Sequence, residues 1–135
     1  MRYQKFSLRI LAATIGLAGS AVAHADLFVI ANPATQITAS EIKEIFTGEK
    51  QIAGSVKLVP VDNGPVQEAF LDTALRMDAP RYNTIWTKKS FREGIIPPTV
   101  KSGNNDVIEF VRRTPGAVGY ISSNPPNGVT VVRKY

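Results

Sequence analysis

Short apolar runs that alternate with helical patterns constrain the fold of this chain more than any other feature. The first run, Leu27 to Ala31, is apolar throughout, which is typical of a strand buried on both faces. Comparable runs recur at Val56 to Val61, Ala117 to Ile121 and Val129 to Val132. Helical patterns separate them, and this alternation indicates an α/β fold with a mixed, mainly parallel sheet flanked by helices on both faces.

Capping residues and apolar spacing predict four helices between these strands. Thr38 and Glu41 form a T-x-x-E capping box, and Gly48 ends the helix that they begin. Paired prolines at 97 and 98 indicate a loop, because proline interrupts both helices and strand ladders. The other predicted helices begin near Pro65, near Arg81, and at Asn104 or Asn105.

The first 25 residues have the plan of a secretory signal peptide. A basic start precedes an apolar core at Ile10 to Ala18, and small residues then lead to an A-x-A-like site. We expect cleavage after Ala25, with Ala23 as the second choice. The core is well short of the ~20 residues that a membrane span needs. The sequence therefore predicts a signal peptide over 1–25 and one periplasmic domain over 26–135, with no membrane span after signal removal.

Composition restricts the chemistry of the mature domain. The chain has no cysteine, and its one histidine, His24, lies in the predicted signal peptide. These absences remove Cys- and His-based nucleophilic sites and the usual zinc sites. Thirteen basic and eleven acidic residues remain after cleavage, a formal charge of +2, and no basic run carries interleaved aromatics. Composition leaves a carboxylate site or a Ser–Lys pair open, but neither shows a recognisable spacing. We expect a protein that is not an enzyme, needs no cofactor or metal, and does not bind nucleic acid.

The stretch "VDNGPVQEAF", Val61 to Phe70, suggests a binding site. It joins a short apolar strand to a helix that opens at a proline. Such a turn presents free backbone N–H groups at a helix N-terminus, a common way to hold an anion.

Three segments in order resemble the periplasmic phosphate-binding proteins of ABC transporters, in a short form that keeps part of the fold. They are "ITASEIKEIFTGEK", "VPVDNGPVQEAF" and "FVRRTPGAVGYI", and the likeness spans about Ile37 to Ile121. The family pattern has a helix ending in I-F-x-G, a strand with P-V, an R-x-x-F or S-G-T helix start, and T-P-G-A-I-G-Y. The last motif is the most specific.

The resemblance implies one lobe of a type 2 periplasmic binding protein. In that family the ligand lies in a cleft between two lobes, held by N–H groups and hydroxyls at helix starts. Ligands of α/β sheets also generally lie at the carboxyl ends of strands. The candidate turns are therefore "NPAT", after the first strand, and "DNGP", after the second. The candidate ligand-binding residues are Asn32, Thr35, Asp62, Asn63, Gly64 and Gln67.

The "DNGP" turn departs from the family pattern in ways that weaken an anion site. Pro65 removes an N–H group that a phosphate could use. Asp62 brings a negative charge, and Gln67 stands where short relatives carry arginine. Each lost charge-assisted hydrogen bond costs roughly 1.5–3 kcal/mol. We therefore expect weak affinity for phosphate or a similar anion such as sulfate.

Two hypotheses about function follow. The first is a non-enzymatic binding protein for a small anion, related to ABC phosphate transport. The alternative is an envelope interaction or assembly module that uses the same fold without a ligand. Since one lobe cannot enclose a ligand alone, we expect a homodimer, or a partner such as an ABC permease or another envelope protein.

The motif "TPGAVGYI" is interpreted as structural. We expect Gly116 to take a positive φ after a helix, and Gly119 to allow close approach of a helix or a neighbouring backbone. We expect Tyr120 to anchor the sheet rather than contact a ligand.

Overall fold

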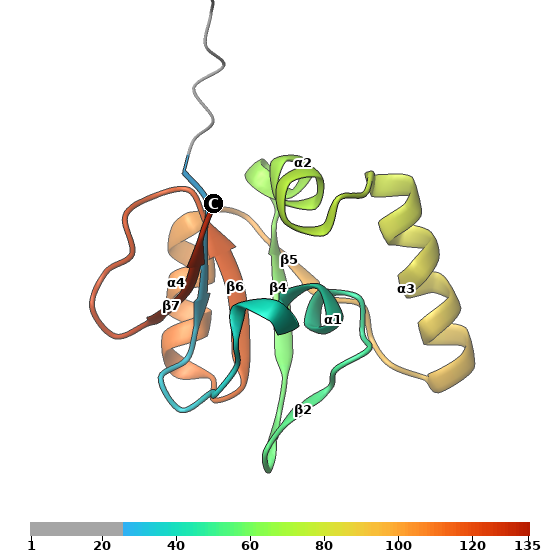
Figure 1. The fold of residues 1–135 in the computed structure, drawn as a ribbon, viewed down its shortest axis with the longest axis horizontal. Coiled ribbons are helices and arrows are strands. Elements are labelled where there is room, and N and C mark those ends of the chain that lie inside the picture. Colours follow the sequence, from blue (N-terminus) through green and yellow to red (C-terminus); the bar gives the residue numbers. More distant parts are fainter. Residues whose placement is uncertain (1–25) are drawn as a thin grey trace, which may run out of the picture.

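A five-stranded sheet forms the centre of the molecule in the computed structural model, which describes residues 26–135 (Figure 1). The strand order is β5-β4-β6-β1-β7, with β4 pairing in parallel with both β5 and β6. Strand β1 runs antiparallel to β6 and β7, so it alone opposes the other four. The expected mixed, mainly parallel sheet is confirmed. The strands are β1 (Phe28–Ala31), β4 (Val59–Asn63), β5 (Thr99–Lys101), β6 (Ala117–Ile121) and β7 (Thr130–Lys134).

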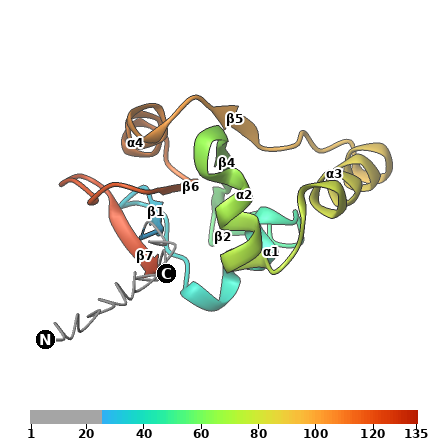
Figure 2. The same cartoon turned by 90° about the horizontal axis from the view of Figure 1, so that it is seen from above.

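Helices cover both faces of this sheet. Helix α4 packs on one face, and the other helices lie on the opposite face, as the view from above shows (Figure 2). Alternation along each strand separates two apolar cores: Val29 and Tyr120 face one, whereas Ile30 and Ile121 face the other. The helical elements are η1 (Ala39–Glu41), α1 (Ile42–Phe46), η2 (Gly64–Val66), α2 (Gln67–Phe70), η3 (Leu71–Leu75), α3 (Ala79–Glu93) and α4 (Asn104–Arg113).

Two features of the fold were missed in the sequence. The predicted strand 56–61 is divided, because β3 (Val56–Lys57) turns back on β2 (Ile52–Ala53) before β4 begins at Val59. Strand β5 was not predicted: it begins at Thr99, the last residue of the stretch 92–99 that was read as a loop. The prolines at 97 and 98 do precede it, and β5 itself is only three residues long, which leaves no periodic pattern to detect.

The two glycines of "TPGAVGYI" have the expected roles. Gly116 has φ +86°, and a Cβ there would lie 2.0 Å from the Lys57 carbonyl oxygen. A Cβ on Gly119 would lie 2.5 Å from Cγ1 of Val107 on α4. Helix α4 therefore packs against the sheet at a distance that only glycine permits.

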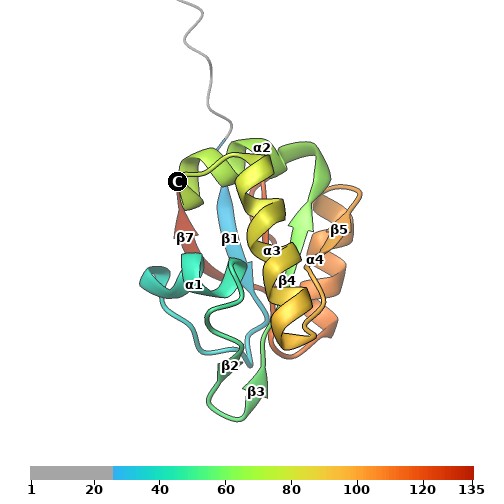
Figure 3. The same ribbon diagram turned by 90° about the vertical axis from the view of Figure 1, so that its right-hand side faces the viewer.

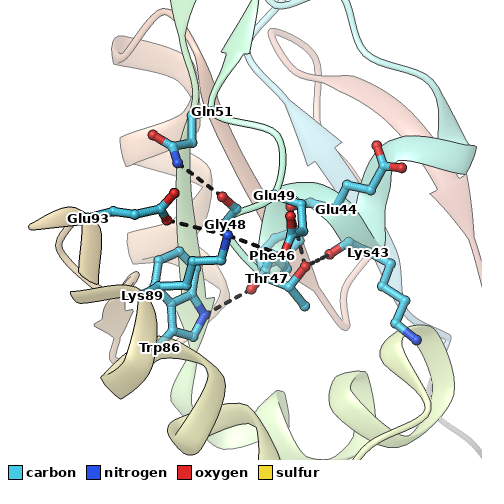
Figure 4. Close-up of polar contacts among 10 residues, drawn as sticks. All are labelled: Lys43, Glu44, Phe46, Thr47, Gly48, Glu49, Gln51, Trp86, Lys89 and Glu93. Carbon is cyan, nitrogen blue, oxygen red and sulfur yellow. Dashed lines mark hydrogen bonds and ion pairs between the residues drawn. The ribbon is translucent and has the colours of Figure 1, made fainter. Parts of the chain in front are cut away.

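Helix α3 stands at the side of the molecule and is attached through the end of α1 (Figures 3 and 4). Trp86 Nε1 donates a 2.9 Å hydrogen bond to the Phe46 carbonyl oxygen. Gly48, at φ +77°, ends the α1 segment as expected, and a Cβ there would lie 3.1 Å from the Trp86 ring. Lys89 adds an ion pair of 3.2 Å to Glu49. The "IFTG" segment, residues 45–48, therefore forms the surface against which α3 packs.

Candidate functional site

The two candidate turns lie at opposite ends of the sheet. Because β1 runs antiparallel to β6, its last residue, Ala31, pairs with Val118 near the start of β6. Strand β4 runs parallel to β6, so its last residue, Asn63, lies at the other end. We call that end, where β4, β5 and β6 finish, the carboxyl edge. The structure does not bring the "NPAT" and "DNGP" turns together.

Asn32 and Thr35 hold the chain together at the far end of the sheet. Asn32 is buried, and its Nδ2 donates hydrogen bonds of 2.9 Å and 3.1 Å to the carbonyls of Val111 and Arg112 at the end of α4. Thr35 Oγ1 accepts a 2.8 Å hydrogen bond from the Gly116 N–H. Both polar groups are occupied by the fold itself, so neither supports the ligand role that the resemblance implied.

Asp62 does not present its charge to a ligand at the "DNGP" turn, contrary to the sequence interpretation. Its side chain is 1 % exposed and accepts hydrogen bonds from the hydroxyls of Tyr82, at 2.8 Å, and Tyr120, at 2.9 Å. Burial raises the pKa of Asp62, and the hydrogen bonds from Tyr82, Tyr120 and Gln67 partly oppose that rise. The carboxylate is a buried polar anchor, and Tyr120 has the structural role expected of it.

The helix after Asn63 begins as a tight turn rather than as an α-helix. Gly64–Val66 is a 3-10 turn with Pro65 in its first positions, and the α-helical part, α2, has four residues. Gln67 is half-buried, and its side chain lies beside the Asp62 carboxylate. This turn is therefore a poorer anion site than a long helix N-terminus would be.

A cluster of polar side chains occupies the carboxyl edge. Asn63 Nδ2 donates hydrogen bonds of 2.9 Å to Asn104 Oδ1 and 3.0 Å to the Tyr120 carbonyl oxygen. The same Asn104 oxygen accepts a 3.0 Å hydrogen bond from the Ser122 N–H. Asn104 Nδ2 in turn donates 3.1 Å to the Ser122 hydroxyl. We call Asn63, Asn104 and Ser122 the amide cluster; it joins β4, α4 and the end of β6.

One atom of the amide cluster lacks a partner. Asn63 is fully buried, and its Oδ1 accepts no hydrogen bond within residues 26–135. A buried unpaired acceptor costs roughly 1–3 kcal/mol, so a donor brought by a ligand or water is favoured there. Helix α4 begins beside it, and its N-cap, Gly103, provides no side-chain cap for the first N–H groups.

Positive charge at this edge is limited. Lys101 pairs with Asn63 in the sheet, but its Nζ lies 4.4 Å from the centre of the Phe110 ring. Asp106, in the first turn of α4, adds a negative charge and accepts a hydrogen bond from Ser102. A Cβ on Gly64 would lie 3.3 Å from the Lys101 carbonyl, which keeps that backbone close to β5. The carboxyl edge therefore provides mainly neutral hydrogen-bond donors and little positive charge.

Sequence reasoning found Asn63 and Gly64 but not the partners of Asn63. Asn104 was recognised only as a possible helix start, and Ser122 was not singled out. The available signal was that polar residues follow the strands at 63, 101 and 122, since parallel strands end at one edge.

Two further observations concern residues 26–135. No helix in this part of the chain is both long and apolar enough to cross a membrane. The same residues contain no group of three or more acidic, histidine or cysteine side chains arranged to hold a metal. The predicted signal peptide lies outside the described residues.

Neither a protein-family model nor a curated protein matches the chain, whereas solved structures do. One is assigned as a phosphate ABC transporter substrate-binding protein from Clostridium perfringens with bound phosphate. It is 20 % identical, with a TM-score of 0.60, over 82 % of this chain and 46 % of that one. PstS from Borrelia burgdorferi is 20 % identical, with a TM-score of 0.52, over 86 % of this chain and 53 % of that one.

These likenesses confirm the fold that the sequence motifs implied. The chain spans about half the length of the structures that it matches. Residues 26–135 have the α/β fold of about half of a phosphate transport substrate-binding protein.

Proposed function

We propose that this protein is a non-enzymatic solute-binding domain that holds a small oxyanion, such as phosphate or sulfate, weakly at the carboxyl edge. The amide cluster carries the proposal. Asn104 Nδ2, the Ser122 hydroxyl and the first N–H groups of α4 provide donors around the unpaired Asn63 Oδ1. That buried Oδ1 can accept a hydrogen bond only from a ligand that carries a proton, which phosphate does and sulfate does not at neutral pH.

The proposed site is one wall of a larger cleft. The chain covers about half of each matched protein, and a single lobe leaves its ligand open to water. A second copy of the chain, or an envelope partner such as an ABC permease, would provide the opposite wall. The predicted signal peptide and the substrate-binding proteins among the structural matches support a periplasmic location.

The alternative function is an envelope interaction module without a ligand. Two observations favour this alternative over tight anion binding. The Asp62 carboxylate and Gln67 lie together beneath the "DNGP" turn, which places a negative charge there. Pro65 provides no N–H group. A site with neutral donors and a nearby Asp106 carboxylate binds anions weakly at best.

Phosphate titration followed by nitrogen-15 NMR separates the two functions. The solute-binding function predicts saturable amide shifts at Asn63, at residues 104–106 and at Ser122. Sodium chloride at equal ionic strength should not reproduce them. If phosphate does not shift these amide signals, or if chloride shifts them equally, the interaction module is the better account.

A further inference from the structure

The solvent-facing side of α3 is basic and carries an exposed aromatic ring. At 100° per residue, Arg81, Lys88, Phe91 and Arg92 share the side opposite the buried Tyr82 and Trp86, and all four are exposed. Phe91 is 92 % exposed. We call these four residues the outer face of α3; Thr84 and Thr87 lie among them, and no acidic residue does.

The three cations of the outer face make no close ion pair in the described part of the chain, although Arg81 lines a pocket together with Glu68, Asp72 and Asp78. None of Arg81, Lys88 and Arg92 forms an ion pair within residues 26–135, whereas Lys89 on the inner side pairs with Glu49 and Glu93. Lys88 and Arg92 are also four residues apart, a spacing at which like charges repel and weaken a helix. An anionic partner would remove that repulsion.

We propose that the outer face of α3 docks on an anionic phospholipid surface. Helix α3 lies at the side of the molecule, away from the sheet (Figures 1 and 2). Arg81 and Arg92 are separated by about 17 Å along the axis, so a flat surface contacts all three cations together. Phe91 supplies the apolar group that enters a membrane interface.

The chemistry of phospholipid headgroups fits this face. A shallow pocket of about 280 Å³ is lined by Ile85, Lys88, Lys89, Arg92 and Glu93. The Glu93 carboxylate in this pocket is paired with Lys89, which leaves Lys88 and Arg92 to donate together to one phosphate group. Each cation near an anionic bilayer strengthens binding severalfold. The interaction is peripheral and independent of the carboxyl edge.

Vesicle co-sedimentation tests the proposal. Phosphatidylcholine vesicles with and without phosphatidylglycerol are compared at low and high salt, using the wild type, K88E/R92E and Phe91→Ser. We expect the wild type to bind only the phosphatidylglycerol vesicles at low salt. K88E/R92E should bind at least tenfold more weakly, and Phe91→Ser severalfold more weakly.

The control is K43E/K57E, which changes the net charge equally at two exposed lysines on other elements. It should retain most of the binding. No binding of the wild type to phosphatidylglycerol vesicles, or equal losses in the two double variants, would overturn the proposal. All substituted residues are exposed, and circular dichroism melting verifies that each variant is folded.

Discussion

The Tyr82 hydroxyl donates a 2.8 Å hydrogen bond to Asp62 Oδ2 and so ties α3 to β4. Tyr120, from β6, donates to the other oxygen of the same carboxylate. Three elements that are distant in sequence therefore meet at one buried charge. Two phenols rather than a cation hold it, and burial raises the pKa of Asp62 above its ordinary value.

Asp62→Asn should change how stability depends on pH. Because the pKa of Asp62 is higher in the folded state, its contribution to stability is fully present below the unfolded pKa and is lost as the pH rises through the folded pKa. The amide variant cannot ionise. We expect the stability of Asp62→Asn relative to the wild type to increase as the pH rises from below the unfolded pKa through the folded one.

Urea denaturation across that pH range measures this difference. Asp72→Asn, at an exposed position on η3, is the matched control for the change of side chain. A constant difference between Asp62→Asn and the wild type would contradict the account of Asp62.

Gly119→Ala should strongly destabilise the domain. The new methyl group would lie 2.5 Å from Val107 Cγ1 and 3.2 Å from Val61 Cγ2, so α4 or the sheet must shift. Overpacking of this kind costs about 1–3 kcal/mol. Gly103→Ala, where no atom lies within 4 Å, should cost less than about 1 kcal/mol. Equal losses of unfolding free energy in the two variants would refute the role given to Gly119.

Trp86→Phe should loosen the attachment of α3. The variant keeps an aromatic ring but loses the indole atoms Cη2 and Cζ3 that face Gly48, and it leaves the buried Phe46 carbonyl without the indole N–H. We expect a loss of about 1–3 kcal/mol. Lys89→Gln removes only the partly exposed ion pairs and should cost much less than Trp86→Phe. Hydrogen exchange of the α3 amides should increase in Trp86→Phe more than in Lys89→Gln; the reverse order would contradict this attachment.

Much of the fold could be predicted because its signals are local. Apolar runs such as 117–121 identified buried strands, and Gly116 indicated a positive φ where the structure has +86°. The capping box is confirmed, with the Thr38 N–H donating 2.8 Å to Glu41 Oε1.

The direction of β1 could not be predicted from its composition. An apolar run identifies a buried strand, but the same residues serve a parallel or an antiparallel neighbour. The sequence therefore suggested that both candidate turns lie near one ligand, whereas β1 is antiparallel to β6 and places Asn32 at the far end.

The burial of Asp62 could not be predicted from the sequence either. A polar residue in a turn usually faces water. Its hydrogen-bond partners, Tyr82 and Tyr120, are 20 and 58 residues away along the chain, so only the tertiary fold brings them together. The amide cluster was missed for the same reason, since Asn63 and Asn104 are 41 residues apart.

Calorimetric titration with phosphate tests the proposed anion site most directly, using two neighbouring asparagines. Asn104 belongs to the amide cluster, whereas the exposed Asn105 makes no side-chain hydrogen bond within residues 26–135. Both lie in the first turn of α4, so their helix effects are similar. Ser122→Ala is a second cluster variant that keeps the test valid if Asn104→Ala unfolds.

The account predicts weak, saturable phosphate binding to the wild type and to Asn105→Ala. Asn104→Ala and Ser122→Ala should each bind about fivefold more weakly, the loss of one hydrogen bond to the ligand. No binding by folded wild type, or the same affinity in all four proteins, would contradict an anion site at the carboxyl edge.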